Sequence, residues 1–266
     1  MHLEVLISCM EQKDESIVRR SKITSDALVI NQCSHNSICE YFREGHNIRI
    51  INTTERGLSK SRNMAIAHAK GDICLLCDDD ETFVENFDKK ILRAFDMLPN
   101  ADIIIFRVFN LPSRLKPYIY KLSYLQCLKV SSCQIAFRRT VIQKHNIKFD
   151  IFMGAGTGNG GGEENKFLLD CNRRGLNIYH VPIEIAFVAQ EKSTWFKGYD
   201  KHFFYQRGIA TRYMLGAPLA VAYAFFYVIK KHVMYKADIS ATAALIATLL
   251  GIKNNDIKTQ QKNGSV

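Results

Sequence analysis

Short apolar runs recur through the first part of the chain and are separated by polar, turn-rich or helix-like stretches. They lie at residues 2–7, 27–30, 48–51, 73–77, 103–106 and 134–137. Between them, residues 61–69 are helix-like, and residues 85–98 repeat apolar side chains at helical spacing and stop at Pro99. Short apolar strands that alternate with helices predict an α/β fold, with a mainly parallel central sheet flanked by helices.

A glycine-rich segment follows this pattern. Residues 154–162 contain six glycines and predict a flexible loop. Residues 163–174 then predict a helix that ends at Gly175, a C-terminal cap. The spacing Gly156-x-Gly158-x-x-Gly161 formally matches a dinucleotide fingerprint, but no first strand–helix unit precedes it, so we interpret it as a loop.

The C-terminal residues 209–266 differ in character from the rest. They contain seven Lys or Arg and two Asp, and so carry half of the chain's formal net charge of +10. Two uncharged runs lie at 213–229 and 239–252, and both are shorter than the ~20 apolar residues of a spanning helix. We expect a basic helical tail that contacts an anionic membrane surface. Packing against the rest of the chain is the alternative, and membrane crossing is least favoured.

Composition limits the class of protein. Hydrophobic residues make up 47% of the 266 residues, enough for a packed core and too many for a disordered chain. The positive charge suits a phosphate-bearing ligand, an anionic membrane or nucleic acid. Because neither zinc-finger spacing nor a base-reading basic helix is present, we expect no nucleic acid partner.

The cysteines and the N-terminal residues indicate in which cellular compartment the protein is expected. Cys74-x-x-Cys77 has metal or redox spacing, but no second pair follows at zinc spacing, so we interpret both as strand residues. The chain does not open on the pattern of a cleaved signal peptide. We therefore expect a cytoplasmic protein with free thiols, peripheral on the inner face of the plasma membrane if the tail binds lipid.

The apolar run at 73–77 ends in three consecutive carboxylates, Asp78, Asp79 and Asp80. Such a strand end lies at the edge where open α/β sheets bind ligands. Adjacent acids repel unless a cation is bound. Mg²⁺ and Mn²⁺ accept carboxylate oxygens and share them with substrate phosphates. The cluster therefore predicts a Mg²⁺ or Mn²⁺ site, with a solvated acidic turn as the alternative.

A second polar segment precedes this strand, at residues 57–63. Gly57 permits a tight turn, and Ser59 or Ser61 is expected to cap the helix that follows. Arg62 then lies in the first turns, where a guanidinium can bind a diphosphate as a fork. A surface salt bridge is the alternative for this arginine.

Together these segments resemble the family 2 glycosyltransferases of the GT-A fold. The resemblance covers about residues 3–200. It rests on Gly-Leu-Ser-x-Ser-Arg-Asn at 57–63, then Gly71-Asp72, the apolar strand and the Asp triplet, and on Gly162-Glu163-Glu164 as the later acidic pair that opens a helix. It implies an inverting enzyme that moves one sugar from a nucleotide-sugar donor to an acceptor hydroxyl.

The resemblance also implies roles for individual residues. Glu164 takes the place of the catalytic base, with Glu163 beside it at the acceptor. Asp80 ligates the metal, and Asp78 shares the metal or holds the donor ribose. The remaining donor-binding residues are expected to be Ser8, Asn31, Gln32, Arg62 and Asp79.

Several positions depart from the family pattern. The acidic pair expected after the second strand is replaced by Asn31 and Gln32, whose amides can still pair with a uracil edge. Glu164 stands where Asp is usual. The Gln-x-x-Arg-Trp signature of processive members is absent, which favours addition of a single sugar. Trp195, with Phe196 and Tyr199 nearby, is expected to stack on the acceptor sugar or to belong to an aromatic core cluster.

The sequence thus predicts a catalytic domain at 1–208 and the basic tail at 209–266. The domain divides into a nucleotide-sugar-binding half at about 1–100 and an acceptor half at about 101–208. We expect a UDP-sugar donor and a glycan or lipid-linked glycan acceptor of bacterial surface polysaccharide synthesis. Two alternatives remain. Asp78-x-Asp80-x-Thr82 also fits the loop of haloacid-dehalogenase-like phosphatases, and a degenerate domain could serve as a membrane-associated scaffold.

Overall fold

A computed structural model describes the whole chain except residues 112–113, 155–156, 158, 160, 190–197 and 255–266. The chain divides into two compact units. The first contains Met1–Asp150 and Glu163–Glu191, and the second contains Ile151–Gly162 and Lys192–Val266. The boundary expected at residue 208 falls inside helix α6 (Lys201–Leu215), so the structural division comes earlier in the chain.

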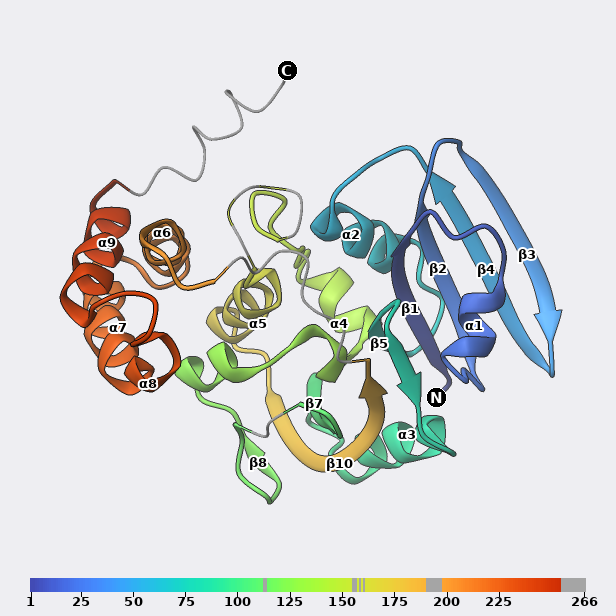
Figure 1. Ribbon diagram of the computed structural model, residues 1–266. Helices are drawn as coiled ribbons and strands as arrows, with labels where there is room; N and C mark the ends of the chain where they lie inside the picture. Colours follow the sequence, from blue (N-terminus) through green and yellow to red (C-terminus); the bar gives the residue numbers. More distant parts are fainter. Residues whose placement is uncertain (112–113, 155–156, 158, 160, 190–197, 255–266) are drawn as a thin grey trace. The chain divides into compact units, whose positions relative to one another are not determined.

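The first unit is built on one sheet, which has ten strands within the described residues (Figure 1). Their order is β3-β4-β2-β1-β5-β9-β7-β10-β6, and β8 also pairs with β10. The strands are β1 (Leu3–Met10), β2 (Asp26–Gln32), β3 (Ser37–Arg43), β4 (His46–Thr53), β5 (Ile73–Asp78), β6 (Glu81–Phe83), β7 (Ile103–Val108), β8 (Tyr120–Lys121), β9 (Ile135–Arg138) and β10 (Ile178–Val188). Strands β4, β2, β1 and β5 run parallel, which confirms the expected parallel sheet.

Helices cover both faces of this sheet. Helices α1 (Ser16–Arg20) and α3 (Phe87–Met97) share one hydrophobic core with Ile7 of β1 and Cys77 of β5. Helix α2 (Leu58–His68) packs on the other face, with α4 (Arg139–Lys144) beside it. Because successive strand residues point to opposite faces, Ser8 and Asp78 face α2. Both side chains hydrogen-bond to residues of that helix.

Four more elements of the first unit lie close to the residues discussed below. Strand β9 lies antiparallel between β5 and β7. The short helices η1 (Tyr124–Lys129) and η2 (Ser132–Gln134) connect β8 to β9. Helix α5 (Glu163–Arg173) begins with the acidic pair and is followed by Gly175 at φ +79°, as the sequence predicted.

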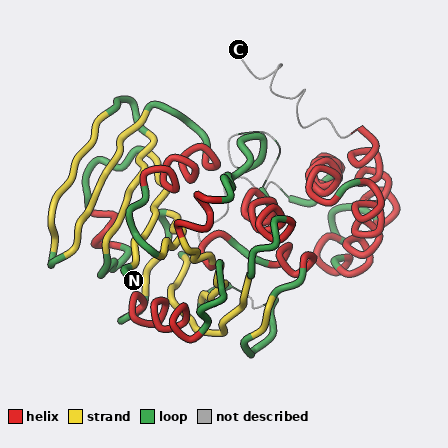
Figure 2. The backbone as a smooth tube through the Cα atoms, turned by 180° about the vertical axis from the view of Figure 1, so that it is seen from behind, coloured by secondary structure: helices red, strands yellow, loops and turns green. Residues whose placement is uncertain are grey.

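From Lys201 to Asn254 the second unit is mainly helical, which confirms the helical tail, while its described residues between Ile151 and Gly162 form turns and bends (Figure 2). It contains α6, α7 (Ala217–Lys230), α8 (His232–Tyr235) and α9 (Ala241–Asn254). The uncharged run at 213–229 is divided because Gly216, at φ +78°, ends α6 and Pro218 lies in the first turn of α7. Among the described helices, none combines the length and the apolar character needed to cross a membrane.

Helix α7 buries only a narrow stripe of small side chains. Ala220, Ala224 and Val228, four residues apart, are buried, as expected for one face of a helix. Large apolar side chains of α7 and α8 are instead exposed. This α7–α8 apolar face comprises Leu219, Val221, Phe225, Phe226, Ile229, Val233 and Met234.

Candidate active site

Arg62 is the centre of a buried ionic cluster. Its Nη1 donates to Glu163 Oε1 at 2.9 Å, and its Nη2 lies 2.8 and 3.1 Å from the two carboxylate oxygens of Asp78. The side chain is 3% exposed, and the ring of Phe149 packs under the guanidinium. One arginine therefore joins α2, the end of β5 and the start of α5.

The electrostatics of this cluster keep Arg62 charged. Burial alone lowers the pKa of the guanidinium, but the carboxylates of Asp78 and Glu163 more than offset it, so the pKa is raised. Because Nη1 and Nη2 both bind carboxylates, the geometry gives Arg62 a positioning role. The direct diphosphate contact expected from the sequence stays a prediction.

Asp78 is held from two sides. Besides Arg62, the hydroxyl of Ser132 on η2 donates to Asp78 Oδ2 at 2.8 Å. Both carboxylate oxygens are thus engaged within the protein, which makes Asp78 the weaker of the two proposed metal ligands. Ser132 was missed by sequence reasoning, because nothing in the Ser-Ser-Cys-Gln stretch at 131–134 marks it as a site residue.

Asp79 and Asp80 follow Asp78 in an exposed turn between β5 and β6. The carbonyl of Asp80 accepts a hydrogen bond from the amide of Ala189 at 2.9 Å, which fixes the turn against the end of β10. Among the described residues, no three His, Cys, Asp or Glu side chains form a metal cage. Mg²⁺ and Mn²⁺ commonly use one or two carboxylates together with substrate phosphates. The exposed carboxylate of Asp80 fits a Mg²⁺ or Mn²⁺ ion that would be held partly by the protein and partly by a substrate phosphate.

Glu81, directly after the triplet, is a further site residue that the sequence reading missed. It is 2% exposed, and its Oε1 accepts the amide of Asp78 at 2.8 Å. Its Oε2 is buried without a hydrogen-bond partner in the described part of the chain. Burial, reinforced by Asp78, raises the pKa of this carboxyl well above its usual range. The only sequence signal was a fourth acid next to three others.

The acidic pair of α5 is divided by its environment. Glu163 is 5% exposed; its Oε1 pairs with Arg62, and its Oε2 is buried without a partner in the described residues. The side chain of Glu164 is only partly exposed, and the charges that act on it most are those of Glu163 and Arg62. Burial first, and then the neighbouring Glu163, raise the pKa of Glu164 to about 8, while Arg62 acts to lower it. Glu163 is therefore part of the ionic cluster, and Glu164 is a basic carboxylate beside it.

Ser8 lies where the sequence placed it, at the carboxyl end of β1 next to Asp78 of β5. Its hydroxyl accepts a hydrogen bond from Ser61 Oγ at 2.9 Å. The expectation that Ser59 or Ser61 caps α2 is wrong. Gly57, at φ +123°, is the N-cap residue without a side-chain cap, and Ser61 lies inside the helix. Glycine suits this position because residues that carry a side chain rarely adopt that backbone φ.

The amides of Asn31 and Gln32 are engaged in holding neighbouring segments. Asn31 Nδ2 donates to Asn52 Oδ1 at 2.8 Å and to the carbonyl of Gln12 at 2.9 Å. Gln32 Oε1 accepts the amide of Gly57 at 2.7 Å. Contact of either amide with a nucleotide base stays a prediction. Trp195 and several glycines of the 154–162 loop lie outside the described residues.

Comparison with known proteins decides the family. The model of the family described as glycosyl transferase family 2 matches residues 15–161, more than half of the chain. The chain belongs to glycosyl transferase family 2. The family resemblance is thereby confirmed; the match includes the motifs at residues 57–80, whereas the acidic pair at 163–164 lies beyond its end and its role stays a prediction.

A sequence relative and two solved structures agree with this family. An uncharacterized glycosyltransferase of Haemophilus influenzae is 26% identical over 91 residues, 34% of this chain and 31% of the relative. S. aureus TarS 1-349 in complex with UDP has a TM-score of 0.57 at 12% identity, over 100% of this chain and 92% of that chain. The mannosyltransferase PcManGT from Pyrobaculum calidifontis, in complex with GDP-Man and Mn²⁺, has a TM-score of 0.51 at 12% identity, over 100% of this chain and 76% of that one.

These comparisons confirm the GT-A-like fold. The matched sequence spans about a third of the Haemophilus influenzae relative, and the chain covers 45% of a longer TarS chain. The phosphatase alternative is not favoured. A nucleophilic Asp78 would need an accessible carboxylate oxygen, whereas Arg62 and Ser132 engage both.

Proposed function

We propose that this family 2 glycosyltransferase transfers one sugar from a UDP-sugar to an acceptor hydroxyl with inversion, as a step in bacterial surface polysaccharide synthesis. The observation that carries the proposal is the pairing of Arg62 with both Asp78 and Glu163. This contact holds the end of β5 next to the start of α5, which supports a site in which the acidic turn would bind the donor and α5 would bear the base. The donor half is about residues 1–100, and the acceptor half about residues 101–208.

On the donor side, the acidic turn faces the leaving diphosphate. Asp80 would hold Mg²⁺ or Mn²⁺, which supplies positive charge to the departing nucleoside diphosphate. Ser8 of β1 pairs in register with Asp78 at the end of the neighbouring β5, and exposed Asp79 follows directly. Both Ser8 and Asp79 would therefore contribute to the donor site. Arg62 holds Asp78 at a fixed position and thereby sets the direction of the turn.

On the acceptor side, Glu164 removes the proton of the attacking hydroxyl. The hydroxyl oxygen attacks the anomeric carbon from the side opposite the diphosphate, so the configuration inverts. A base works best with a pKa near the working pH, and burial beside Glu163 raises the pKa of Glu164 to about 8. Glu163 is turned to Arg62, and its unpartnered Oε2 is suited to accept a hydrogen bond from another acceptor hydroxyl.

The α7–α8 apolar face favours the proposal that the acceptor is linked to lipid. Phe226, Ile229 and Val233 are 59%, 75% and 78% exposed, and Lys230, Lys231 and Lys236 flank them in sequence. Apolar side chains next to lysines suit the interface of an anionic bilayer. We propose that this face holds the enzyme on the inner surface of the plasma membrane, where it meets lipid-linked glycans.

A screen of nucleotide sugars tests the proposed donor. The thermal unfolding midpoint is measured with UDP-, GDP-, dTDP- and CMP-sugars, each with and without Mn²⁺. We expect a UDP-sugar with Mn²⁺ to raise the midpoint most, since ligand binding to the folded state stabilises it. Stabilisation by GDP-sugars alone would overturn the UDP assignment. Stabilisation by none of them would overturn the proposed function.

A further inference from the structure

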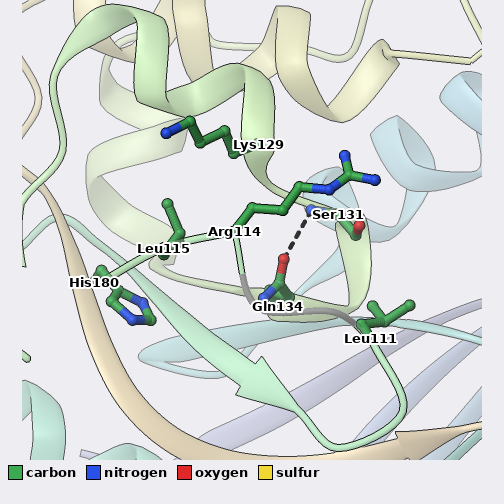
Figure 3. Close-up of a pocket in the computed structure, with 7 residues that line it drawn as sticks. All are labelled: Leu111, Arg114, Leu115, Lys129, Ser131, Gln134 and His180. Carbon is green, nitrogen blue, oxygen red and sulfur yellow. Dashed lines mark hydrogen bonds between the residues drawn. The ribbon is translucent and has the colours of Figure 1, made fainter. Parts of the chain in front are cut away.

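The cavity beside His180 in the first unit is too small for a sugar or a nucleotide (Figure 3). Its volume is about 40 Å³, enough for about three water molecules. The Nδ1 of His180 lies 2.9 Å from the carbonyl oxygen of Ile105, and Gln134 Oε1 accepts the amide of Ser131 at 2.9 Å. These contacts support the local fold and leave little room for a ligand.

Arg207 of α6, in the second unit, is a partly buried cation that forms no ion pair with an acid among the described residues. Residues 201–254 contain seven Lys or Arg and a single acid, Asp238. The Nε of Arg207 is buried and makes no hydrogen bond within the described part of the chain. A guanidinium that is taken out of water is usually paired with an acid. The charge of Arg207 is therefore available to an anion that comes from outside the chain.

Two tyrosines of α7 hold this guanidinium in place. The guanidinium carbon of Arg207 lies 3.6 Å from the centre of the Tyr227 ring, and its Nη2 donates to the hydroxyl of Tyr223 at 3.4 Å. Tyr223 and Tyr227 are about one helical turn apart, so both reach the same arginine. Stacking on an aromatic ring fixes the plane of a guanidinium without neutralising its charge. Arg207 is thus positioned in advance for contact with an oxyanion.

Two hydrogen-bond donors remain at this position. The Nη1 of Arg207 has no acceptor among the residues that the structure describes. The hydroxyl of Tyr223 accepts from Arg207, so its own proton can be donated to another group. Arg207, Tyr223 and Tyr227 are each partly open to solvent, so a ligand can reach them. A cationic N–H beside a phenolic O–H suits the oxygens of a phosphate group.

The same tyrosines border the α7–α8 apolar face. The ring centres of Tyr223 and Phe226 are 6.0 Å apart, and Phe226 is 59% exposed on that face. A ligand whose phosphate lies at Arg207 would therefore have apolar surface directly beside it. A phospholipid has this arrangement, because its phosphate is joined through glycerol to its acyl chains. Free phosphate would use the cation alone, and a neutral detergent would use the apolar face alone.

We propose that Arg207, Tyr223 and Tyr227, here named the Arg207 site, bind the phosphate of a membrane phospholipid whose acyl chains contact the α7–α8 apolar face. The inference rests on the proposed function for the attachment to a bilayer, and adds a specific headgroup contact to it. Attachment then depends on a phosphate at one position as well as on the general negative charge of the surface. A site of this kind would fix the orientation of the second unit on the bilayer.

The test is calorimetric titration of the whole chain with three probes, each below the concentration at which it forms micelles. Dihexanoylphosphatidylglycerol carries both a phosphate and acyl chains, inorganic phosphate carries the charge alone, and octyl glucoside carries an apolar chain without charge. The variants are Arg207→Gln and Arg207→Lys. Arg212→Gln is the matched control, because Arg212 is also a partly buried arginine of α6 and points about 140° away from Arg207 around the helix.

We expect the phospholipid to bind about tenfold or more tightly than either of the other two probes. Arg207→Gln should lower its affinity by about tenfold or more, because a charge-assisted hydrogen bond to phosphate is lost. Arg212→Gln should leave the affinity unchanged. Arg207→Lys keeps the charge but loses the stacked planar group, so the affinity should fall as well. If circular dichroism shows that Arg207→Gln does not fold, Arg207→Lys and the three-probe comparison decide.

The inference is overturned if the phospholipid does not bind, or if the Arg207 variants bind it as the wild type does. It is also overturned if Arg212→Gln weakens binding as much as they do. Inorganic phosphate that binds as tightly as the phospholipid would show a site for free phosphate instead. Octyl glucoside that binds as tightly would show an apolar surface without a headgroup site.

The donor screen keeps this test separate from the proposed function. If the phospholipid binds at Arg207 but no nucleotide sugar stabilises the protein, the proposed transfer reaction fails and the lipid site stands. If a UDP-sugar stabilises the wild type and Arg207→Lys equally while the phospholipid does not bind, the lipid site fails and the proposed transfer reaction stands.

Discussion

Arg62 and Glu163 lie 101 positions apart in the sequence and form a buried ion pair with an Nη1–Oε1 distance of 2.9 Å. The same guanidinium binds Asp78, so two acidic segments that repel each other are held together by one cation. A buried pair contributes little net stability because both charges are desolvated, but removal of one partner leaves the others uncompensated. The arginine is therefore expected to matter for stability as well as for catalysis.

Replacement of Arg62 by Ala should lower the free energy of unfolding by about 3–5 kcal/mol, because Asp78 and Glu163 then lose their buried counter-charge. Urea unfolding followed by circular dichroism measures the change. Arg93→Ala removes an exposed arginine of α3 and should change the free energy by less than about 0.5 kcal/mol. A similar small change for both variants would mean that the cluster is not what holds α5 to the sheet.

Glu164→Gln should lower turnover by about 10²-fold or more, because the amide cannot accept the acceptor proton. Affinity for the donor should stay nearly unchanged. Glu163→Gln should chiefly raise the Michaelis constant of the acceptor, since its Oε2 is placed to bind an acceptor hydroxyl. Steady-state kinetics with both substrates varied separates the two, and an exchange of these phenotypes would assign the base to Glu163.

The pH dependence of turnover gives an independent check on the same assignment. The pKa of Glu164 is raised to about 8, and a base must be ionised, so the rate should rise as the pH increases through about 8. Glu163→Gln removes a neighbouring negative charge, which lowers the pKa of Glu164 and should move this rise to lower pH. If the turnover of the wild type and of Glu163→Gln rises over the same pH range, Glu164 does not control the pH dependence.

Much of the sheet could be predicted because its strands are buried on both faces and therefore read as continuous apolar runs. Strand β10 was missed because Pro182 interrupts it, and proline lacks the amide that a central strand needs. The structure accommodates it at a shift of register with β7 between His180 and Glu184. Edge strand β3 was missed because most of its side chains are exposed, so the alternation is weak.

The site was predictable only where a motif marked it. Asp78, Asp80 and the pair at 163–164 stand out in the sequence, and the family match includes the first two. Which partners they bind was not predictable. The contact of Ser132 with Asp78 joins residues 54 positions apart, and the Arg62–Glu163 pair depends on how α5 packs. These contacts depend on which side chains the fold buries next to one another, and the residue types alone do not show that.

Gly208→Ala should destabilise the second unit, because α6 and α9 approach through their backbones. A Cβ at Gly208 would lie 2.1 Å from the carbonyl oxygen of Thr248, and one at Gly251 would lie 2.0 Å from that of Tyr205. The helices would have to separate, at a cost of about 1–3 kcal/mol or more. Calorimetric unfolding should show a lowered midpoint, with Gly161→Ala, which meets no atom within 4 Å, as the control. Equal midpoints in the two variants would contradict the close packing.

Phe226→Glu and Ile229→Glu should each weaken binding to anionic vesicles, because each side chain would contribute about 1.5–3 kcal/mol if fully inserted. Co-sedimentation with phosphatidylglycerol vesicles measures the effect, and wild-type binding should fall as salt rises. Ile38→Glu is the matched control, since Ile38 is 75% exposed, as Ile229 is, but lies on β3 of the first unit. If Ile38→Glu weakens binding as much as the α7 variants do, the α7–α8 apolar face is not the attachment surface.

The central claim is that the acidic turn supports transfer from a nucleotide sugar, and release of UDP from a UDP-sugar with Mn²⁺ and acceptor present tests it most directly. We predict steady release by the wild type and by Asp96→Asn, which neutralises an exposed acid of α3. Release by Asp80→Asn should fall to the level without enzyme, and exhaustive chelation should do the same to the wild type. Release that survives both chelation and Asp80→Asn would contradict the account.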